Sequence, residues 1–170
     1  LDYTLKALKI LRNDFPKIHL IIIGKIKKNG HTERLIKKLN LEANVIFRSN
    51  LSKLDIKELY ASSSIAIVSS LYEGFGYPVI EAMSCEIPLI ATNVSAIPEL
   101  TSNYAKLIEP KNSEMISNSA KEILSNYPKY IEIAQKGRQH VIQNFKLIKI
   151  TKEYEKVISK TIEEFNNANF

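Results

Sequence analysis

The stretch that decides the fold is SIAIVSSLYEGFGYPVIEAMSCEIPLIAT, residues 64–92. It opens with an apolar, β-branched run, passes through a turn with two glycines, continues with helical spacing and ends in a second apolar run. Two short apolar strands joined through a helix are typical of a parallel sheet, because parallel neighbours need a long crossover. We interpret 64–69, 78–85 and 88–92 as strand, helix and strand.

The same alternation extends toward both ends of the chain. Elements are predicted there as helices 2–14, 32–40 and 55–62, strands 19–24, 44–48 and 105–108, a turn at 97–100, and helices 113–125, 128–143 and 147–166. Strand 19–24, HLIIIG, is a short apolar, β-branched stretch that ends in glycine, which predicts a strand covered on both faces. The pattern indicates one α/β domain over 1–170, with a doubly wound parallel sheet.

Composition limits the classes of function. With 170 residues, 45% of them hydrophobic, the chain can bury one sizeable core. No apolar run reaches the roughly 18 to 20 residues of a membrane-spanning helix, so we expect a soluble protein. Cys85 is the only cysteine, which excludes an internal disulfide. A reducing compartment is therefore favoured, and we expect a cytoplasmic protein, with the inner face of the membrane as a second location.

The net charge of +6 is concentrated in one segment, residues 25–38, which carries six Lys and Arg side chains against Glu33 alone. A solvated loop and helix face is the favoured interpretation, with a local anion site as the alternative. A nucleic-acid binder would rest on net charge only, and we expect no nucleic-acid partner.

In open parallel sheets, ligands bind at the carboxyl ends of the strands. The predicted ends are all small or polar: Gly24–Lys25, Ser49–Asn50, Ser69–Ser70 and Thr92–Asn93. After Ser70 the chain enters the glycine turn, defined as Glu73–Tyr77, and Pro78 then suits the first turn of a helix. Unpaired N–H groups at such a helix start favour anionic oxygens, as in a diphosphate.

Two glutamates eight positions apart, Glu73 and Glu81, flank this turn. Carboxylates repel phosphate but accept hydrogen bonds from vicinal hydroxyls, as in a sugar. Glu81 is therefore a candidate for a ribose, and Glu73 for a second sugar beyond the diphosphate. The spacing alone does not support these roles, because it recurs in predicted helices whose glutamates we interpret as solvated: Glu114 with Glu122, and Glu155 with Glu163. What distinguishes Glu73 and Glu81 is the strand before them, the two glycines between them and the helix that begins at the proline.

The stretch EGFGYPVIEAMSCEIPLIAT resembles the E-x7-E donor-site signature of retaining glycosyltransferases of family four, which have two Rossmann-like domains facing across a cleft. Similar segments run through most of the chain: LIIIG, NVIFRSNLSKLDIKELYASSSIAIVSS, SAIPEL, LIEP and GRQHVIQNF. Together they resemble the carboxyl-terminal, nucleotide-sugar-binding domain of this GT-B fold. The resemblance implies a Rossmann-like sheet.

The resemblance also implies roles for the matching residues. Glu73 matches the glutamate that contacts hydroxyls of the transferred sugar and is the catalytic candidate, whereas Glu81 matches the ribose-binding glutamate. The turn between them matches backbone amides that reach the donor sugar and the phosphates, contributed by Gly74, Phe75, Gly76 and Tyr77. Nucleotide contacts are implied at the first two strand ends, for Gly24, Arg48 and Asn50. Lys25 is a candidate for the diphosphate, in partial place of the family's basic pair, although an exposed, solvated lysine is the favoured interpretation.

The implied reaction transfers a sugar from a UDP- or GDP-sugar to a glycan or a lipid-linked saccharide, in cell-surface polysaccharide biosynthesis. It retains the anomeric configuration, and neither a metal nor another cofactor is implied. A non-catalytic Rossmann-type nucleotide-binding module is the alternative. A dehydrogenase and a P-loop enzyme are disfavoured because the glycine patterns G-x-G-x-x-G and G-x4-G-K-[ST] are absent.

Several features of the family pattern are missing. The chain opens in a helix without an initiating methionine, so the family's first strand, central in its sheet, is absent together with the arginine and lysine that follow it. The acceptor-binding amino-terminal domain is absent too. We therefore expect this chain to be a fragment whose partner is that domain, and we expect the fragment alone to be inactive. The full enzyme is expected to associate peripherally with a membrane.

Two further expectations concern the carboxyl-terminal helices. The helix at 147–166 resembles the segment that returns to the amino-terminal domain. Its apolar stripe is therefore expected to be partly exposed unless it packs on its own domain; the stripe consists of Ile150, Tyr154, Val157, Ile158 and Ile162. His140, in the preceding helix, is interpreted as a surface residue. His19 and His31 lack Cys or Asp partners at ligand spacing, which disfavours a metal site.

Overall fold

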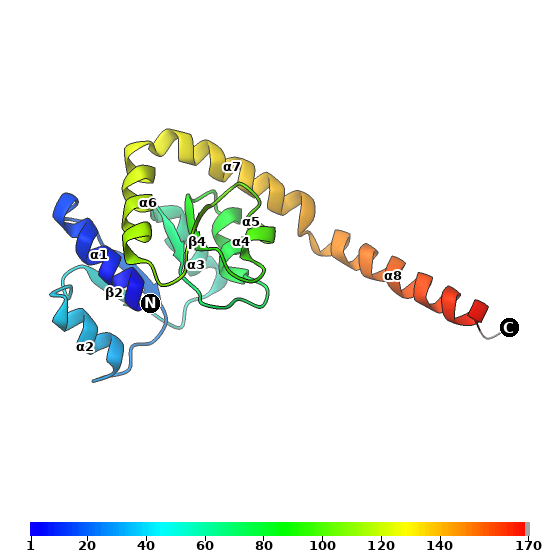
Figure 1. The fold of residues 1–170 in the computed structure, drawn as a ribbon, viewed down its shortest axis with the longest axis horizontal. Helices are drawn as coiled ribbons and strands as arrows, with labels where there is room; N and C mark the ends of the chain where they lie inside the picture. The colour runs from blue at the N-terminus through cyan, green and yellow to red at the C-terminus, as the bar shows by residue number, and fades with distance from the viewer. Residues whose placement is uncertain (169–170) are drawn as a thin grey trace.

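A computed structural model of the chain describes residues 1–168 (Figure 1). The strands are β1 Leu20–Ile23, β2 Val45–Arg48, β3 Ala66–Val68, β4 Leu89–Thr92 and β5 Lys106–Ile108. The helices are α1 Asp2–Asp14, α2 His31–Lys38, α3 Lys53–Ser62, α4 Tyr77–Ser84, α5 Ile97–Thr101, α6 Ser113–Ser125, α7 Tyr127–Asn144 and α8 Leu147–Ala168. All predicted strands and helices are present.

The segment predicted as a turn at 97–100 is instead the short helix α5, so that prediction was wrong. Pro98 stands in its first turn, where a missing N–H costs nothing. At its other end, the Thr101 hydroxyl donates a hydrogen bond to the Ile97 carbonyl oxygen at 2.9 Å. These two local features close one helical turn that periodicity alone could not reveal.

The strands pair in parallel throughout, which confirms the predicted class of a parallel sheet wound with helices. They form two groups, β1–β2 and β3–β4–β5, within the described residues. In the first group Leu20 is opposite Val45, and in the second Ile90 is opposite both Ile67 and Lys106. No ladder joins β1 to β3 in residues 1–168.

The three-stranded sheet is covered on both faces. Side chains alternate along its strands, so that Ala66, Val68, Leu89 and Ala91 pack with buried residues of α4, α5 and α7. Their neighbours Ile67, Ile90 and Ile108 pack on the other side with α1 and α6. All four residues of β4 are buried as a result. Its continuous apolar run therefore reflects a strand enclosed from both sides.

The two-stranded sheet has one well-packed face. Leu20, Ile22, Val45 and Phe47 pack against α1 and α2, whereas Ile23 is 48% exposed. The prediction that the strand at 19–24 is covered on both faces was therefore wrong. The physical reason is that α3, the next helix along the chain, contributes no buried residue.

Helix α1 joins the two sheets. Leu5 and Leu8 belong to the core of the two-stranded sheet, and Ala7 and Leu11 belong to the core under β4 and β5. Near its start, the hydroxyls of Thr4 and Ser69 share a hydrogen bond of 2.8 Å. The helix thus lies across the boundary between the sheets and contacts the end of β3.

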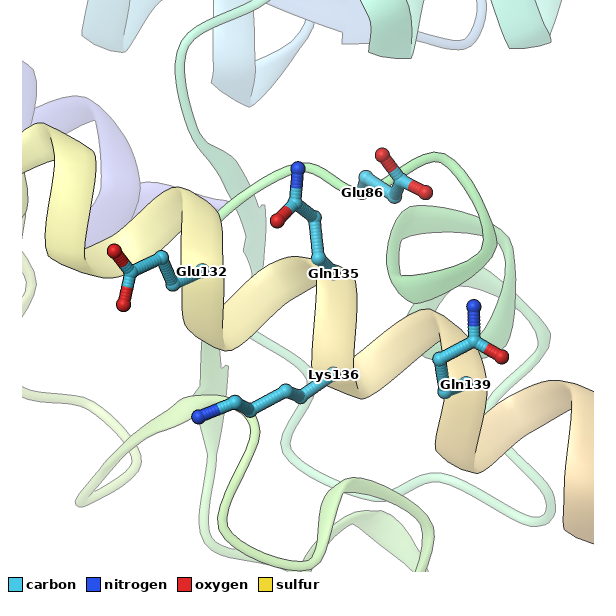
Figure 2. Close-up of a pocket in the computed structure, with 5 residues that line it drawn as sticks. All are labelled: Glu86, Glu132, Gln135, Lys136 and Gln139. Atoms are coloured by element: carbon cyan, nitrogen blue, oxygen red, sulfur yellow. The ribbon is translucent and has the colours of Figure 1, made fainter.

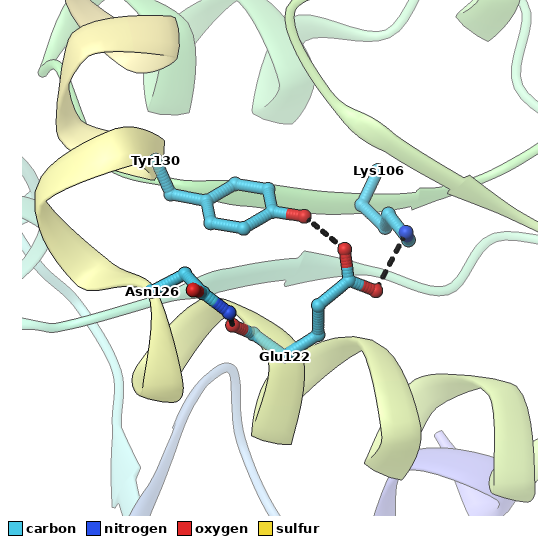
Figure 3. A network of polar contacts seen from close by, with 4 residues as sticks. All are labelled: Lys106, Glu122, Asn126 and Tyr130. Atoms are coloured by element: carbon cyan, nitrogen blue, oxygen red, sulfur yellow. Dashed lines mark hydrogen bonds and ion pairs between the residues drawn. The ribbon is translucent and has the colours of Figure 1, made fainter.

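A polar network connects β5, α6 and α7 (Figure 3). The Glu122 carboxylate accepts hydrogen bonds from the Lys106 ammonium at 2.7 Å and from the Tyr130 hydroxyl, while the Asn126 side chain donates to the Glu122 carbonyl at 3.1 Å. These bonds lower the pKa of Glu122, and the same carboxylate raises the pKa of Tyr130 to about 12. The network therefore favours the ionised carboxylate and the neutral phenol.

Helix α8 extends away from the rest of the domain (Figure 1). Four apolar side chains of its predicted stripe are more than half exposed: Tyr154, Val157, Ile158 and Ile162. The expected exposure of this stripe is confirmed. Among residues 1–168, no helix combines the length and the apolar composition that crossing a membrane requires.

Candidate functional site

The carboxyl ends of the parallel strands form the edge that carries the candidate site. β1 and β2 end side by side, because the Gly24 N–H donates to the Arg48 carbonyl oxygen at 2.7 Å. β3 and β4 end side by side as well, with Val68 opposite Ala91. Parallel pairing places all of these ends on one side of their sheets. The glycine turn starts from the end of β3 and leads into α4.

Gly76 shapes the glycine turn. Its φ of +103° lies in a region that residues with a Cβ rarely adopt, and it precedes the first residue of α4. A Cβ at this position would lie 2.7 Å from Cδ1 of the buried Leu100. Its carbonyl oxygen accepts from the N–H groups of Val79 and Ile80, which starts the helix. Glycine at this position is therefore a structural requirement of the turn.

The turn leaves its own amides free. Within the described residues, the N–H groups of Gly74, Phe75, Gly76 and Tyr77 donate no hydrogen bond to protein atoms. They lie at the amino-terminal end of α4, where the helix dipole adds partial positive charge. Backbone donors in this position favour an anionic group, such as a phosphate oxygen.

Glu73 lies in the turn, half-buried, and is held from the strand end. One oxygen of its carboxylate, Oε2, accepts a hydrogen bond from the Ser70 hydroxyl at 3.1 Å. Among residues 1–168, Oε1 has no hydrogen-bond partner. Because a carboxylate offers about four acceptor positions, Glu73 keeps most of its capacity for an external donor.

Glu81 is exposed on α4, on the other side of Gly76 in the chain. Its carboxylate forms no hydrogen bond or ion pair with the described residues. It lies close enough to Tyr60 to affect that side chain: burial first, and then the charge of Glu81, raise the pKa of Tyr60 to about 12. The Tyr60 hydroxyl donates to the Pro78 carbonyl oxygen at 3.4 Å, so this tyrosine contacts the first turn of α4.

The other predicted donor-binding residues form a second group, at the ends of β1 and β2. Gly24 and Arg48 are adjacent through the hydrogen bond described above, Lys25 is exposed, and Asn50 follows with φ of +57°. Within residues 1–168, no hydrogen bond or ion pair connects these residues to the glycine turn. The residues predicted to bind the donor therefore lie in two groups, one at the strand ends of each sheet, and α1 packs against both sheets.

Aromatic side chains extend from the turn toward the end of α7. The Phe75 ring lies 5.0 Å from Tyr77 and 6.5 Å from Phe145, and Phe145 lies 5.8 Å from His140, between ring centroids. His140 is half-buried, and within the described residues its Nε2 is buried without a hydrogen-bond partner. The interpretation of His140 as a surface residue was wrong, because α7 packs this face against Tyr104 and Phe145.

A shallow recess lies elsewhere, along α7 (Figure 2). It is lined by Glu86, Glu132, Gln135, Lys136 and Gln139, which are polar and carry none of the predicted donor contacts. Across residues 1–168, no three His, Cys, Asp or Glu side chains gather as a metal site would require. A metal-independent donor site stays a prediction.

Sequence reasoning missed the side chains that hold the turn in place. Thr92, at the end of β4, donates from its hydroxyl to the Ser70 carbonyl oxygen at 2.6 Å, and Phe145 packs beside Phe75. Thr92 and Ser70 were recognisable as small polar residues at strand ends. Their pairing with each other depends on strand order, which local pattern does not contain.

Comparisons with known proteins show which proteins this chain is similar to. The MMP alpha-(1->4)-mannosyltransferase of Mycolicibacterium hassiacum is 29% identical over 150 residues, which are 84% of this chain and 36% of that protein. The chain spans less than half the length of the first curated relatives that it matches. The similarity is thus to one part of longer enzymes.

Solved structures show the same fold. The C-terminal domain of a glycosyl transferase group 1 family protein from Francisella tularensis superposes with a TM-score of 0.75 at 26% identity, covering 86% of this chain and 79% of that one. HepE of Anabaena, solved in complex with UDP-glucose, gives a TM-score of 0.81 at 23% identity over 93% of this chain and 44% of its own. The model of the family described as glycosyl transferases group 1 matches residues 1–158. This chain therefore belongs to the glycosyl transferases group 1 family.

Proposed function

We propose that this chain is the donor-binding half of a retaining glycosyltransferase, which transfers a sugar from a nucleotide-diphosphate sugar to a glycan or lipid-linked acceptor. One observation carries the proposal. Glu73 and Glu81 flank a turn whose four backbone amides, from Gly74 to Tyr77, have no partner among the described residues. Acceptors for sugar hydroxyls therefore stand on either side of donors for phosphate oxygens.

Each part of the site has a role in this proposal. Glu81 accepts from the ribose hydroxyls, the turn amides hold the diphosphate, and Glu73 accepts from hydroxyls of the transferred sugar through its free Oε1. The N–H donors and the dipole of α4 also stabilise the charge that develops on the leaving diphosphate. The residues at the ends of β1 and β2, Gly24, Arg48 and Asn50, contact the base, and Lys25 adds positive charge toward the diphosphate.

The rest of the proposed enzyme lies in the remaining polypeptide. An amino-terminal domain supplies the acceptor site, as the length of the relatives suggests. The acceptor belongs to cell-surface polysaccharide biosynthesis, consistent with relatives such as an O-antigen chain mannosyltransferase of Escherichia coli. We propose that the diphosphate needs no metal, and that the full enzyme works at the inner face of the membrane.

Ligand-induced thermal stabilisation of the full chain tests the donor site. UDP-glucose or GDP-mannose at one hundred times its dissociation constant should stabilise the fold by about 2.7 kcal/mol. For a chain of this size that is a rise in melting temperature of roughly 5–10 °C. Glu81→Ala should remove most of this rise for the nucleotide sugar and for the free nucleotide alike.

Glu73→Ala should act differently, because Glu73 contacts only the transferred sugar. It should weaken binding of the nucleotide sugar and leave binding of the nucleotide nearly unchanged. Glu163→Ala is the matched control, since Glu163 is an exposed glutamate of α8 that follows Glu155 at the same sequence spacing. Equal losses from the Glu73 and Glu81 variants would refute the division of roles, and the absence of any shift would refute the donor site.

A further inference from the structure

Thr92 ends β4 directly beside the end of β3, and only 1% of it is exposed. A hydroxyl in such a position needs a hydrogen-bond partner, because burying it unpaired is costly. Its partner is not a ligand but the backbone of the neighbouring strand end. The way this bond is made connects Thr92 to the glycine turn.

The Thr92 hydroxyl extends the ladder between β3 and β4. Backbone pairing of the two strands ends at Val68 and Ala91. Beyond that pair, Thr92 Oγ1 lies 2.6 Å from the Ser70 carbonyl oxygen and 3.4 Å from that of Val68. A hydroxyl has one proton to donate, and the shorter contact identifies the Ser70 carbonyl as its acceptor. This bond fixes the backbone at the residue where the turn departs.

Ser70 passes the constraint to Glu73. While its carbonyl oxygen is held by Thr92, its own hydroxyl donates to Glu73 Oε2 at 3.1 Å. On the other flank of the same strand end, Ser69 bonds to Thr4 of α1. The segment that carries Glu73 is thus held from β4 on one side and from α1 on the other.

The chemistry of this arrangement suits a carboxylate that must remain available. A neutral hydroxyl orients the Glu73 carboxylate and leaves its charge in place, whereas a lysine or arginine would neutralise that charge. The bond uses Oε2 only, which leaves Oε1 directed by the same constraint and unoccupied by the described residues. The geometry points to a relay from Thr92 through Ser70 to Glu73.

We propose that Thr92 is a positioning residue, which acts through Ser70 on Glu73. Through Glu73 it sets the preference of the site for a nucleotide sugar over the free nucleotide. This inference rests on the proposed function, because it takes the transferred sugar as the ligand of Glu73. Thr92 itself touches no substrate. Its hydroxyl determines where the Glu73 carboxylate stands relative to the turn amides.

The test measures by calorimetry how tightly the full chain binds a nucleotide sugar and the matching free nucleotide. The pairs compared are UDP-glucose with UDP, and GDP-mannose with GDP. Thr92→Val keeps the shape of the side chain and removes the hydroxyl. The affinity ratio of nucleotide sugar to nucleotide should fall by about 2- to 10-fold, the range expected for one lost hydrogen bond. Thr92→Ser, which restores a hydroxyl, should recover most of the ratio.

Two further variants separate positioning from stability. Thr101→Val removes another fully buried threonine hydroxyl, which bonds to a backbone carbonyl within α5, so it should lower the melting temperature and leave the ratio unchanged. Ser70→Ala breaks the second bond of the relay at a less buried site. It should lower the ratio as Thr92→Val does, and an unchanged ratio would refute the relay even if Thr92→Val does not fold.

The outcomes are distinguishable. If the unsubstituted chain binds nucleotide sugars in preference to nucleotides and both Thr92→Val and Ser70→Ala keep that preference, the positioning role is refuted and the proposed function stands. A similar fall in both affinities, at constant ratio, also refutes it, since that is the effect of a general structural defect. If the unsubstituted chain binds neither ligand, the proposed function fails, and this inference with it.

Discussion

The two sheets of this domain differ in how completely they are enclosed. The sheet β3–β4–β5 has helices on both faces, and every residue of β4 is buried. The sheet β1–β2 is packed on the face that meets α1 and α2, and neither strand has a fully buried residue. The enclosed sheet carries the glycine turn with Glu73 and Glu81, whereas the thinner sheet leads into the basic segment 25–38.

The difference shows where the site can be rigid. Beside the enclosed sheet, Thr92 and Ser70 hold the segment that carries Glu73 through hydrogen bonds, and Gly76 lies against Leu100 of α5. The ends of β1 and β2 have fewer buried neighbours. Local stability follows buried apolar contacts, so we expect the thinner sheet to open more readily. Three predictions test this contrast, in order of expected effect.

The largest effect should come from the core of the enclosed sheet. Ile90→Ala at the centre of β4, where the side chain is completely buried, should lower the free energy of unfolding by about 2–5 kcal/mol. Ile22→Ala in the half-buried β1 should lose roughly half as much or less, because water already reaches that strand. Urea unfolding of both variants measures the difference, and equal losses would erase the contrast.

An intermediate effect is expected at the turn. Gly76→Ala should lower the free energy of unfolding by about 1–2 kcal/mol, because alanine must adopt a positive φ. Its Cβ must also displace Leu100. Gly74→Ala is the control, since a Cβ there meets nothing within 4 Å, and it should change stability by less than about 0.5 kcal/mol. Equal melting temperatures of Gly76→Ala and Gly74→Ala would contradict the structural requirement for glycine at position 76.

The smallest effect should be pH-dependent and should come from the network of Figure 3. The pKa of Glu122 is lowered by its bonds to Lys106 and Tyr130, so its contribution to stability is present above the ordinary carboxyl value of 4.5. That contribution is lost as the pH falls through the lowered pKa. Glu122→Gln should lower the melting temperature at pH 7 by about 1–3 °C, and this deficit should shrink at pH 3.

Glu33→Gln, in helix α2 beside the thinner sheet, serves as the comparison. The pKa of Glu33 is also lowered, by its bonds to Lys37 and to the Asn29 N–H, but these partners lie in or next to the same helix. Removing that carboxylate should therefore change the melting temperature less than Glu122→Gln, whose bonds join β5, α6 and α7. A larger effect for Glu33→Gln at pH 7 would be the contrary result.

Much of the fold could be predicted because its signals are local. The periodicity of 2–14 predicts a helix and the apolar run of 88–92 predicts a strand. The alternation of strands and helices along the chain indicates parallel pairing. The glycine turn was equally legible, since its glycines, proline and glutamates stand within nine residues. The turn and its flanking elements lie where they were predicted.

The failures share a physical cause. The exposed side of β1 depends on which helix covers it, and the half-buried state of His140 depends on how α7 packs against Tyr104 and Phe145. Neither is written in the residues themselves. The helix α5 was missed because five residues are too few for a periodic pattern, while one side-chain hydrogen bond is enough to close the turn.

The sequence by itself determined the order of strands and helices, the glycine turn with its two glutamates, and the likeness to a family of sugar-transferring enzymes, because each depends on residues near one another in the chain. Only the tertiary structure decided which strand ends meet. It placed the Thr92 hydroxyl against Ser70, twenty-two residues earlier, and α1 across two sheets of unequal burial. Contacts of that kind form when distant segments pack together, and the packing that selects them is a property of the whole fold.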